Sequence, residues 1–120
     1  MKQPRQETEK ALEQDALQVE RHENGVVLIK IQSEPLGILR FGVKRALQAL
    51  LEDLEADRGV KCLVLTGVGK AFSVGSDIRD FSTEIGWLLE NEYVEAGLNA
   101  AIETSRLPVI AALNGFALGG

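Results

Sequence analysis

Two short apolar runs, each followed by a segment that contains glycine, constrain the fold of this chain most strongly. The first run is Val60 to Thr66, and the second, Val109 to Leu113, begins after Pro108. Nearly continuous apolar runs of this length are typical of strands that are covered on both faces of a sheet. Segments with a helical pattern lie before and between the two runs, so the order of elements predicts an α/β layer structure.

The residues before the first run predict a β-hairpin and then a helix. Residues 17–20 alternate apolar and polar, residues 26–31 are rich in β-branched side chains, and Asn24-Gly25 lies between them. Asn-Gly at this place predicts a type I′ turn, because both residues tolerate a positive φ. Apolar residues then recur at helical spacing, which predicts one helix from about 40 to 56 and a second from about 84 to 104.

Composition and charge exclude several classes of function. Hydrophobic residues make up 45% of the chain and charged residues 26%, as in a globular protein. The net charge is −5 and Lys and Arg do not cluster, so we expect no nucleic-acid partner. No apolar run approaches the roughly 18 residues of a membrane span, and residues 1–14 lack the apolar segment of a secretory signal. We therefore expect a cytoplasmic protein without a membrane partner.

Residues 1–16 are predicted to form a polar, solvated arm, and residues 17–120 the folded region. The single cysteine, Cys62, lies within the first apolar run, and we interpret it as a small core residue.

The glycine-containing segments are the candidate site. In open α/β sheets, ligands gather beyond the carboxyl ends of the strands. Small residues there allow a ligand to approach the backbone and leave its N–H groups available. Two such N–H groups from different loops, directed at one point, would stabilise a developing oxyanion.

A phosphate-binding loop at Gly67-Val68-Gly69-Lys70 is excluded by its neighbours. A Walker A loop would need glycine in place of Val64 and Ser or Thr in place of Ala71. The dinucleotide pattern G-x-G-x-x-G would need glycine in place of Phe72. Both patterns fail, so we interpret the segment as a strand-to-loop turn.

Two longer motifs are more specific. The strand residues Leu63-Val64-Leu65-Thr66-Gly67 are followed by Lys70-Ala71-Phe72-Ser73-Val74-Gly75-Ser76-Asp77-Ile78, and about forty residues later comes the run Pro108 to Gly120. The first motif resembles the first signature of the crotonase superfamily, the enoyl-CoA hydratase/isomerase family. The second resembles the second signature of that family, as far as its second consecutive glycine. The resemblance extends from about Leu17 to Gly120.

The resemblance implies a spiral of ββα units, of which residues 17–120 would be the amino-terminal part. It implies an acyl-CoA-binding enzyme that stabilises a thioester enolate, with an oxyanion hole made by the backbone N–H groups of Ser76 and Gly120. The other substrate-binding residues that it implies are Gly37, Ile38, Leu39, Gly75, Asp77, Ile78, Arg79 and Gly119. Many relatives have Asn-Ala-Leu where this chain has Gly37-Ile38-Leu39, which weakens the expected adenine contacts there.

Several of these residues also have structural interpretations. Asp77 is suited to cap the helical turn that starts at Ile78. Arg79 is interpreted either as a phosphate ligand or as a solvated cation, and the hydroxyl of Ser76 as incidental. In the second helix, core packing is favoured over the lining of an acyl pocket for four residues, Leu88, Leu89, Tyr93 and Ala96.

The resemblance leaves the reaction open. Hydratases of the family place one glutamate just after the Gly-Gly-Gly run and another farther on, and both positions would lie beyond Gly120. We expect a lyase or isomerase of enoyl-CoA hydratase/isomerase type. The alternatives are another crotonase reaction, such as that of an isomerase or an acyl-CoA hydrolase, and a non-catalytic CoA-binding module.

The expected partner is an acyl-CoA thioester, with coenzyme A as part of the substrate and no separate cofactor or metal. A family-type homo-oligomer, a trimer or hexamer, is expected only for a full-length protein. The 120 residues by themselves are expected to lack hydratase activity, because an acid/base pair typically contributes about 10²–10⁴-fold per group.

Overall fold

The computed structural model describes residues 15–120, and residues 1–14, which make up most of the predicted arm, lie outside the described residues. A four-stranded sheet has the order β1-β2-β3-β5. Its first two strands, β1 (Leu17–Arg21) and β2 (Val26–Ile31), are antiparallel. The strands β3 (Cys62–Gly67) and β5 (Val109–Ala112) continue the sheet in parallel with β2.

A second, smaller sheet lies beyond the ends of β3 and β5. It pairs β4 (Ala71–Ser73) with β6 (Phe116–Ala117) in parallel. With the helices α2 (Phe41–Ala56) and α3 (Ile85–Glu103), the element order is β1-β2-α2, β3-β4-α3 and then β5-β6. The chain thus repeats a ββα unit, as the predicted spiral requires.

The predicted hairpin and both predicted helices are present. The turn between β1 and β2 is a 3₁₀ turn (Glu23–Gly25), in which Asn24 and Gly25 have φ values of 64° and 82°. These left-handed conformations are the ones that Asn and Gly adopt at least cost. Each helix begins one residue after its predicted start, and α3 ends one residue before its predicted end.

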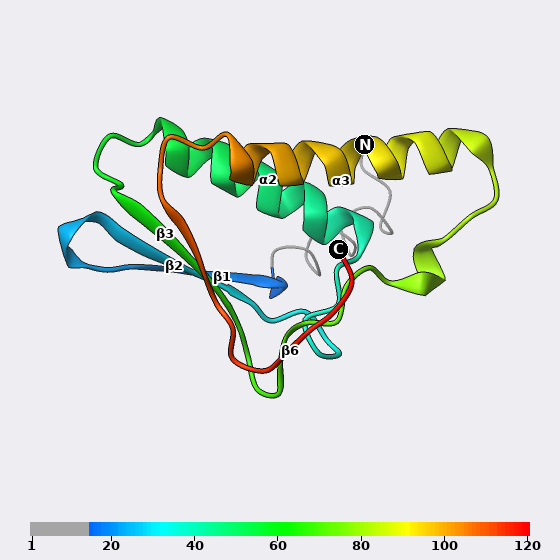
Figure 1. The fold of residues 1–120 in the computed structure, drawn as a ribbon, viewed down its shortest axis with the longest axis horizontal. Helices are drawn as coiled ribbons and strands as arrows, with labels where there is room; N and C mark the ends of the chain where they lie inside the picture. Colours follow the sequence, from blue (N-terminus) through cyan, green and yellow to red (C-terminus); the bar gives the residue numbers. More distant parts are fainter. Residues whose placement is uncertain (1–14) are drawn as a thin grey trace, which may run out of the picture.

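Both helices cover the same face of the large sheet (Figure 1). Leu47, Leu51 and Leu54 of α2 and Leu98 of α3 pack with β2 and β3, whose Ile29 and Leu63 are fully buried. The core therefore lies between the sheet and the two helices. No helix within residues 15–120 is long and apolar enough to cross a membrane.

The prediction that the apolar strands are covered on both faces is wrong for the part of the chain that the structure describes. In β3 buried and half-buried residues alternate, and Cys62 is only half-buried. In β5 residues 110–112 are exposed, and Ile110 retains 52% of its accessible surface. The reason is that α2 and α3 cover one face only.

Candidate functional site

The two glycine segments of the sequence lie against each other. Because β4 and β6 pair in parallel, with Ser73 opposite Ala117, the residues after both strands run side by side. The Leu118 N–H donates to the Ser73 carbonyl at 3.0 Å. Gly75 and Gly119 have φ values of 90° and 76°, and a Cβ on Gly119 would lie 3.0 Å from the Gly75 Cα. Glycine is required at both positions for this approach of two backbones.

The two predicted oxyanion donors come directly after these glycines. Ser76 follows Gly75 and Gly120 follows Gly119. Within residues 15–120, neither backbone N–H donates a hydrogen bond to another protein group. The structure therefore brings Ser76 and Gly120 onto adjacent segments, with both donors unused by the fold.

The third predicted binding segment, Gly37-Ile38-Leu39, adjoins the first two. The Leu39 N–H donates to the Gly75 carbonyl at 2.8 Å, and the Asp77 N–H donates to the Leu39 carbonyl at 3.2 Å. These bonds form a short parallel bridge between Leu39 and Ser76. The segment that was expected to lie beside the adenosine part of coenzyme A is thus attached to the loop that carries Ser76.

Ser73 joins all three segments, a role that sequence analysis missed. Its side chain is buried, its hydroxyl donates to the Gly37 carbonyl at 2.8 Å, and the same oxygen accepts from the Gly75 N–H at 3.1 Å. Its carbonyl accepts from Leu118, as described above. A serine within the apolar strand β4 was the available signal, because a buried hydroxyl needs partners.

Asp77 and Arg79 form an ion pair at the edge of this site. The Asp77 carboxylate accepts from the Arg79 backbone N–H at 2.9 Å, which confirms the predicted cap of the turn at Ile78. The guanidinium of Arg79 also donates to it, with Nη2 2.8 Å from Oδ2. The side-chain hydrogen bond from Arg79, and then the backbone one, lower the pKa of Asp77.

This pair leaves both interpretations of Arg79, phosphate ligand and solvated cation, as predictions. The Arg79 side chain is 70% exposed, as that of a solvated cation is, and it also pairs with the carboxylate of Asp77. Ile78, between the two paired residues, is 77% exposed. The site thus contains Asp77 as a structural carboxylate rather than as an unpaired catalytic one.

Sequence analysis also missed a buried lysine. Lys44 of α2 is only 2% exposed, and its ammonium donates to the Ser76 Oγ at 2.7 Å. The same nitrogen lies 3.7 Å from Glu95 Oε2 of α3. The Ser76 hydroxyl, interpreted from the sequence as incidental, therefore has a charged partner. The signal was present, because Lys44 lies at helical spacing with Leu47 and Leu51 on the apolar face of α2.

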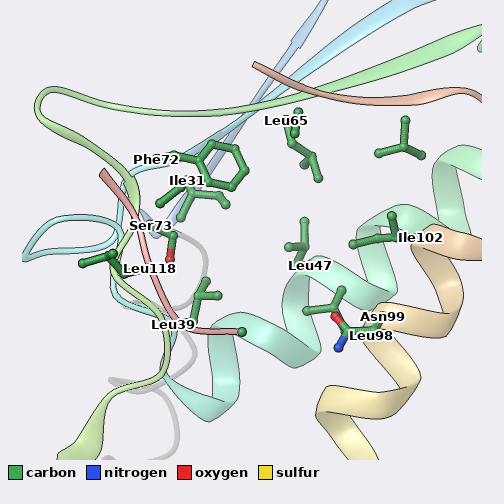
Figure 2. A pocket seen from close by; sticks show the side chains of 15 residues that line it. Ile31, Leu39, Leu47, Leu65, Phe72, Ser73, Leu98, Asn99, Ile102 and Leu118 are labelled. Carbon is green, nitrogen blue, oxygen red and sulfur yellow. The ribbon is translucent and has the colours of Figure 1, made fainter. Parts of the chain in front are cut away.

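An apolar cavity of about 310 Å³ lies between the sheet, α2 and α3, next to the glycine segments. Figure 2 shows aliphatic side chains and Phe72 around it, with Ser73 and Asn99 as polar groups. Gly119 and Gly120 also line this cavity. The site therefore combines backbone donors with an adjoining apolar space.

In the amino-terminal half of α3 only Val94 is buried, and residues 85–93 are exposed or half-buried. Leu88, Leu89, Tyr93 and Ala96 are all exposed, so the prediction of core packing was wrong. This half of the helix extends past the sheet (Figure 1). Trp87 instead packs on Phe81, with 5.9 Å between the ring centroids.

Comparisons with known proteins show the family to which the chain belongs. The family model described as "Enoyl-CoA hydratase/isomerase" matches residues 21–120. A Bacillus subtilis protein named "Probable enoyl-CoA hydratase" is 34% identical over 97 residues, which cover 79% of this chain and 38% of that protein. The chain thus spans about two fifths of the length of this relative.

Solved structures show the same relationship. Pseudomonas aeruginosa DspI superimposes with a TM-score of 0.80 and 32% identity, covering 85% of this chain and 39% of that one. An enoyl-CoA hydratase from Bacillus anthracis gives a TM-score of 0.78 and 25% identity, with 85% and 41% covered. The predicted fold class, a partial crotonase-like spiral, is confirmed. The chain belongs to the enoyl-CoA hydratase/isomerase family.

Proposed function

We propose that this chain binds the thioester group of an acyl-CoA and stabilises its enolate, with the N–H groups of Ser76 and Gly120 as the oxyanion hole. Both donors would hydrogen-bond the thioester oxygen, on which negative charge develops when a proton is removed or a nucleophile is added. Preorganised donors of this kind cost no reorganisation at the moment of reaction. The reaction type that we propose is that of the family, the hydration or isomerisation of an enoyl-CoA.

The observation that carries this proposal is the contact between Gly75 and Gly119. The next residue after each glycine, Ser76 or Gly120, has a backbone N–H without a protein acceptor within residues 15–120, and the contact brings these two groups to the same part of the molecule. The adjoining apolar cavity supports an acyl substrate, because a hydrocarbon chain beside the thioester needs an apolar surface.

The path of coenzyme A is part of the same proposal. The segment Gly37-Ile38-Leu39 would lie along it, because it is joined to the Ser76 loop through the Leu39 bridge. Gly75, Asp77, Ile78 and Arg79 would border the pantetheine arm, with Asp77 and Arg79 acting as a pair that shapes the loop.

A test of the proposal is the infrared carbonyl stretch of a bound thioester. Butyryl-CoA, labelled with ¹³C at the thioester carbonyl, would be added to the complete gene product. Two hydrogen bonds to the oxygen should move the stretch to lower frequency. The control is the thioether analogue, which lacks this oxygen and should bind more weakly. Butyryl-CoA that binds with an unshifted carbonyl, or does not bind at all, would contradict the proposal.

A further inference from the structure

The Lys44 ammonium lies close to both segments that carry the proposed donors, although Lys44 itself belongs to α2. Within residues 15–120 it is one of two buried charged residues, with Asp77, and each retains 2% of its accessible surface. A buried ammonium is costly unless it is paired and hydrogen-bonded. Its partners are the Ser76 hydroxyl at 2.7 Å and the Glu95 carboxylate at 3.7 Å.

These two partners belong to the two halves of the proposed oxyanion hole. Ser76 carries the first donor. The carboxylate of Glu95 lies against the second, because a Cβ built on Gly120 would collide with Glu95 Oε1. Lys44 therefore connects α2, the loop after β4 and α3 at the point where both donors lie.

The charges explain why such a connection matters. A carboxylate beside Gly120 would oppose negative charge on a thioester oxygen that is held there. The ammonium of Lys44 offsets that charge, and its hydrogen bond holds the Ser76 side chain in place. Both effects favour an oxyanion between the two donors.

We propose that Lys44 is a positioning residue of the oxyanion hole, which orients Ser76 and neutralises Glu95 beside Gly120. This inference rests on the proposed function. It adds a charged group that acts through the Ser76 hydroxyl and the Glu95 carboxylate, and that does not itself touch the substrate oxygen.

The test uses the same labelled butyryl-CoA and the complete gene product. Lys44→Met should weaken binding roughly tenfold, the scale of one charge-assisted hydrogen bond, and should reduce the carbonyl shift. The double variant Lys44→Met/Glu95→Gln removes the uncompensated carboxylate and should recover most of the shift. A purely structural role of Lys44 predicts no such recovery.

Lys30→Met is the matched control. Lys30 also forms an ion pair, with Glu20 at 2.9 Å, but on the hairpin away from the donors. This variant should keep the affinity and the carbonyl shift of the unaltered protein. Circular dichroism and melting temperature establish that each variant is folded.

Ser76→Ala keeps the proposal testable if Lys44→Met does not fold. It retains the N–H donor and removes only the hydroxyl that Lys44 holds, so the carbonyl shift should fall in part. A folded Lys44→Met or Ser76→Ala with an unchanged shift would overturn the inference. If the unaltered protein binds butyryl-CoA with an unshifted carbonyl stretch, the proposed function itself is refuted.

Discussion

Gly75 and Gly119 are in backbone contact although they lie 44 positions apart in the sequence. A Cβ on Gly75 would lie 3.0 Å from the Leu118 carbonyl oxygen, and one on Gly119 would lie 3.0 Å from the Gly75 Cα. Each glycine thus fits because it has no side chain of its own, since a Cβ would press against the backbone of the other segment. The distance between the two proposed donors depends on this contact.

Gly75→Ala should therefore damage the site more than an ordinary glycine substitution does. The matched control is Gly69→Ala, because Gly69 also has a positive φ, 75°, but has open space where its Cβ would be. The control should lose about 1–2 kcal/mol from backbone strain alone. Gly75→Ala should lose more, and should also weaken butyryl-CoA binding. Urea denaturation and a binding titration measure the two effects, and equal losses for both variants would contradict the prediction.

The Asp77–Arg79 pair should make stability depend on pH in the acid range. Because its pKa is lowered in the folded state, Asp77 contributes stability that is present above its unfolded pKa and is lost as pH falls through the folded one. Arg79→Gln removes the largest cause of that shift. The acid-unfolding midpoint, followed by circular dichroism, should then move to higher pH.

A matched control for this experiment is Arg58→Gln, which removes an exposed arginine from the turn after α2. Its acid midpoint should stay close to that of the unaltered chain. If Arg58→Gln moved the midpoint as far as Arg79→Gln, net charge rather than the Asp77 pair would be responsible.

The exposed apolar residues after α3 predict self-association of the 120-residue chain. Ile110, Leu113, Phe116 and Leu118 each retain at least half of their accessible surface. Apolar surface of this kind favours association. Sedimentation should show a mass that rises with concentration, and Ile110→Thr with Leu113→Ser should reduce it. A monomer with a sharp, cooperative thermal transition would count against this prediction.

Local signals in the sequence predicted most of the fold. The Asn24-Gly25 turn, the face of α2 with Leu47 and Leu51, and the cap at Asp77 each depend on residues close together in the chain. The strands β4 and β6 were not predicted, because two or three residues carry no periodic pattern and exist as strands only through their pairing.

The site was predicted only in part, because local motifs do not reveal contacts between distant elements. The motifs located Ser76 and Gly120, but the contact from Lys44 to Ser76 joins residues that are 32 positions apart and come from different elements. A lysine on an apolar helix face predicts burial but not the partner. Only the packing of α2 against the β4 loop and α3 supplies that partner.

Ser76 is the position where the role of the backbone can be separated from that of the side chain. In an enoyl-CoA turnover assay on the complete gene product, Ser76→Ala keeps the N–H donor and loses the hydrogen bond from Lys44. It should lower kcat by up to about tenfold. Ser76→Pro removes the donor itself and should lower kcat by about 10²–10³-fold, the usual scale for one oxyanion-hole hydrogen bond.

Proline also fixes φ, so a loss of rate in Ser76→Pro is interpretable only if the protein still folds. An unchanged melting temperature is the required control, and the carbonyl shift of bound butyryl-CoA provides a readout that does not need turnover. If Ser76→Ala, in folded protein, removes as much activity and as much carbonyl shift as Ser76→Pro, the hydroxyl and not the backbone N–H is the active group. The assignment of Ser76 as a backbone donor would then be wrong, and the contact from Lys44 to its hydroxyl would become the central feature of the site.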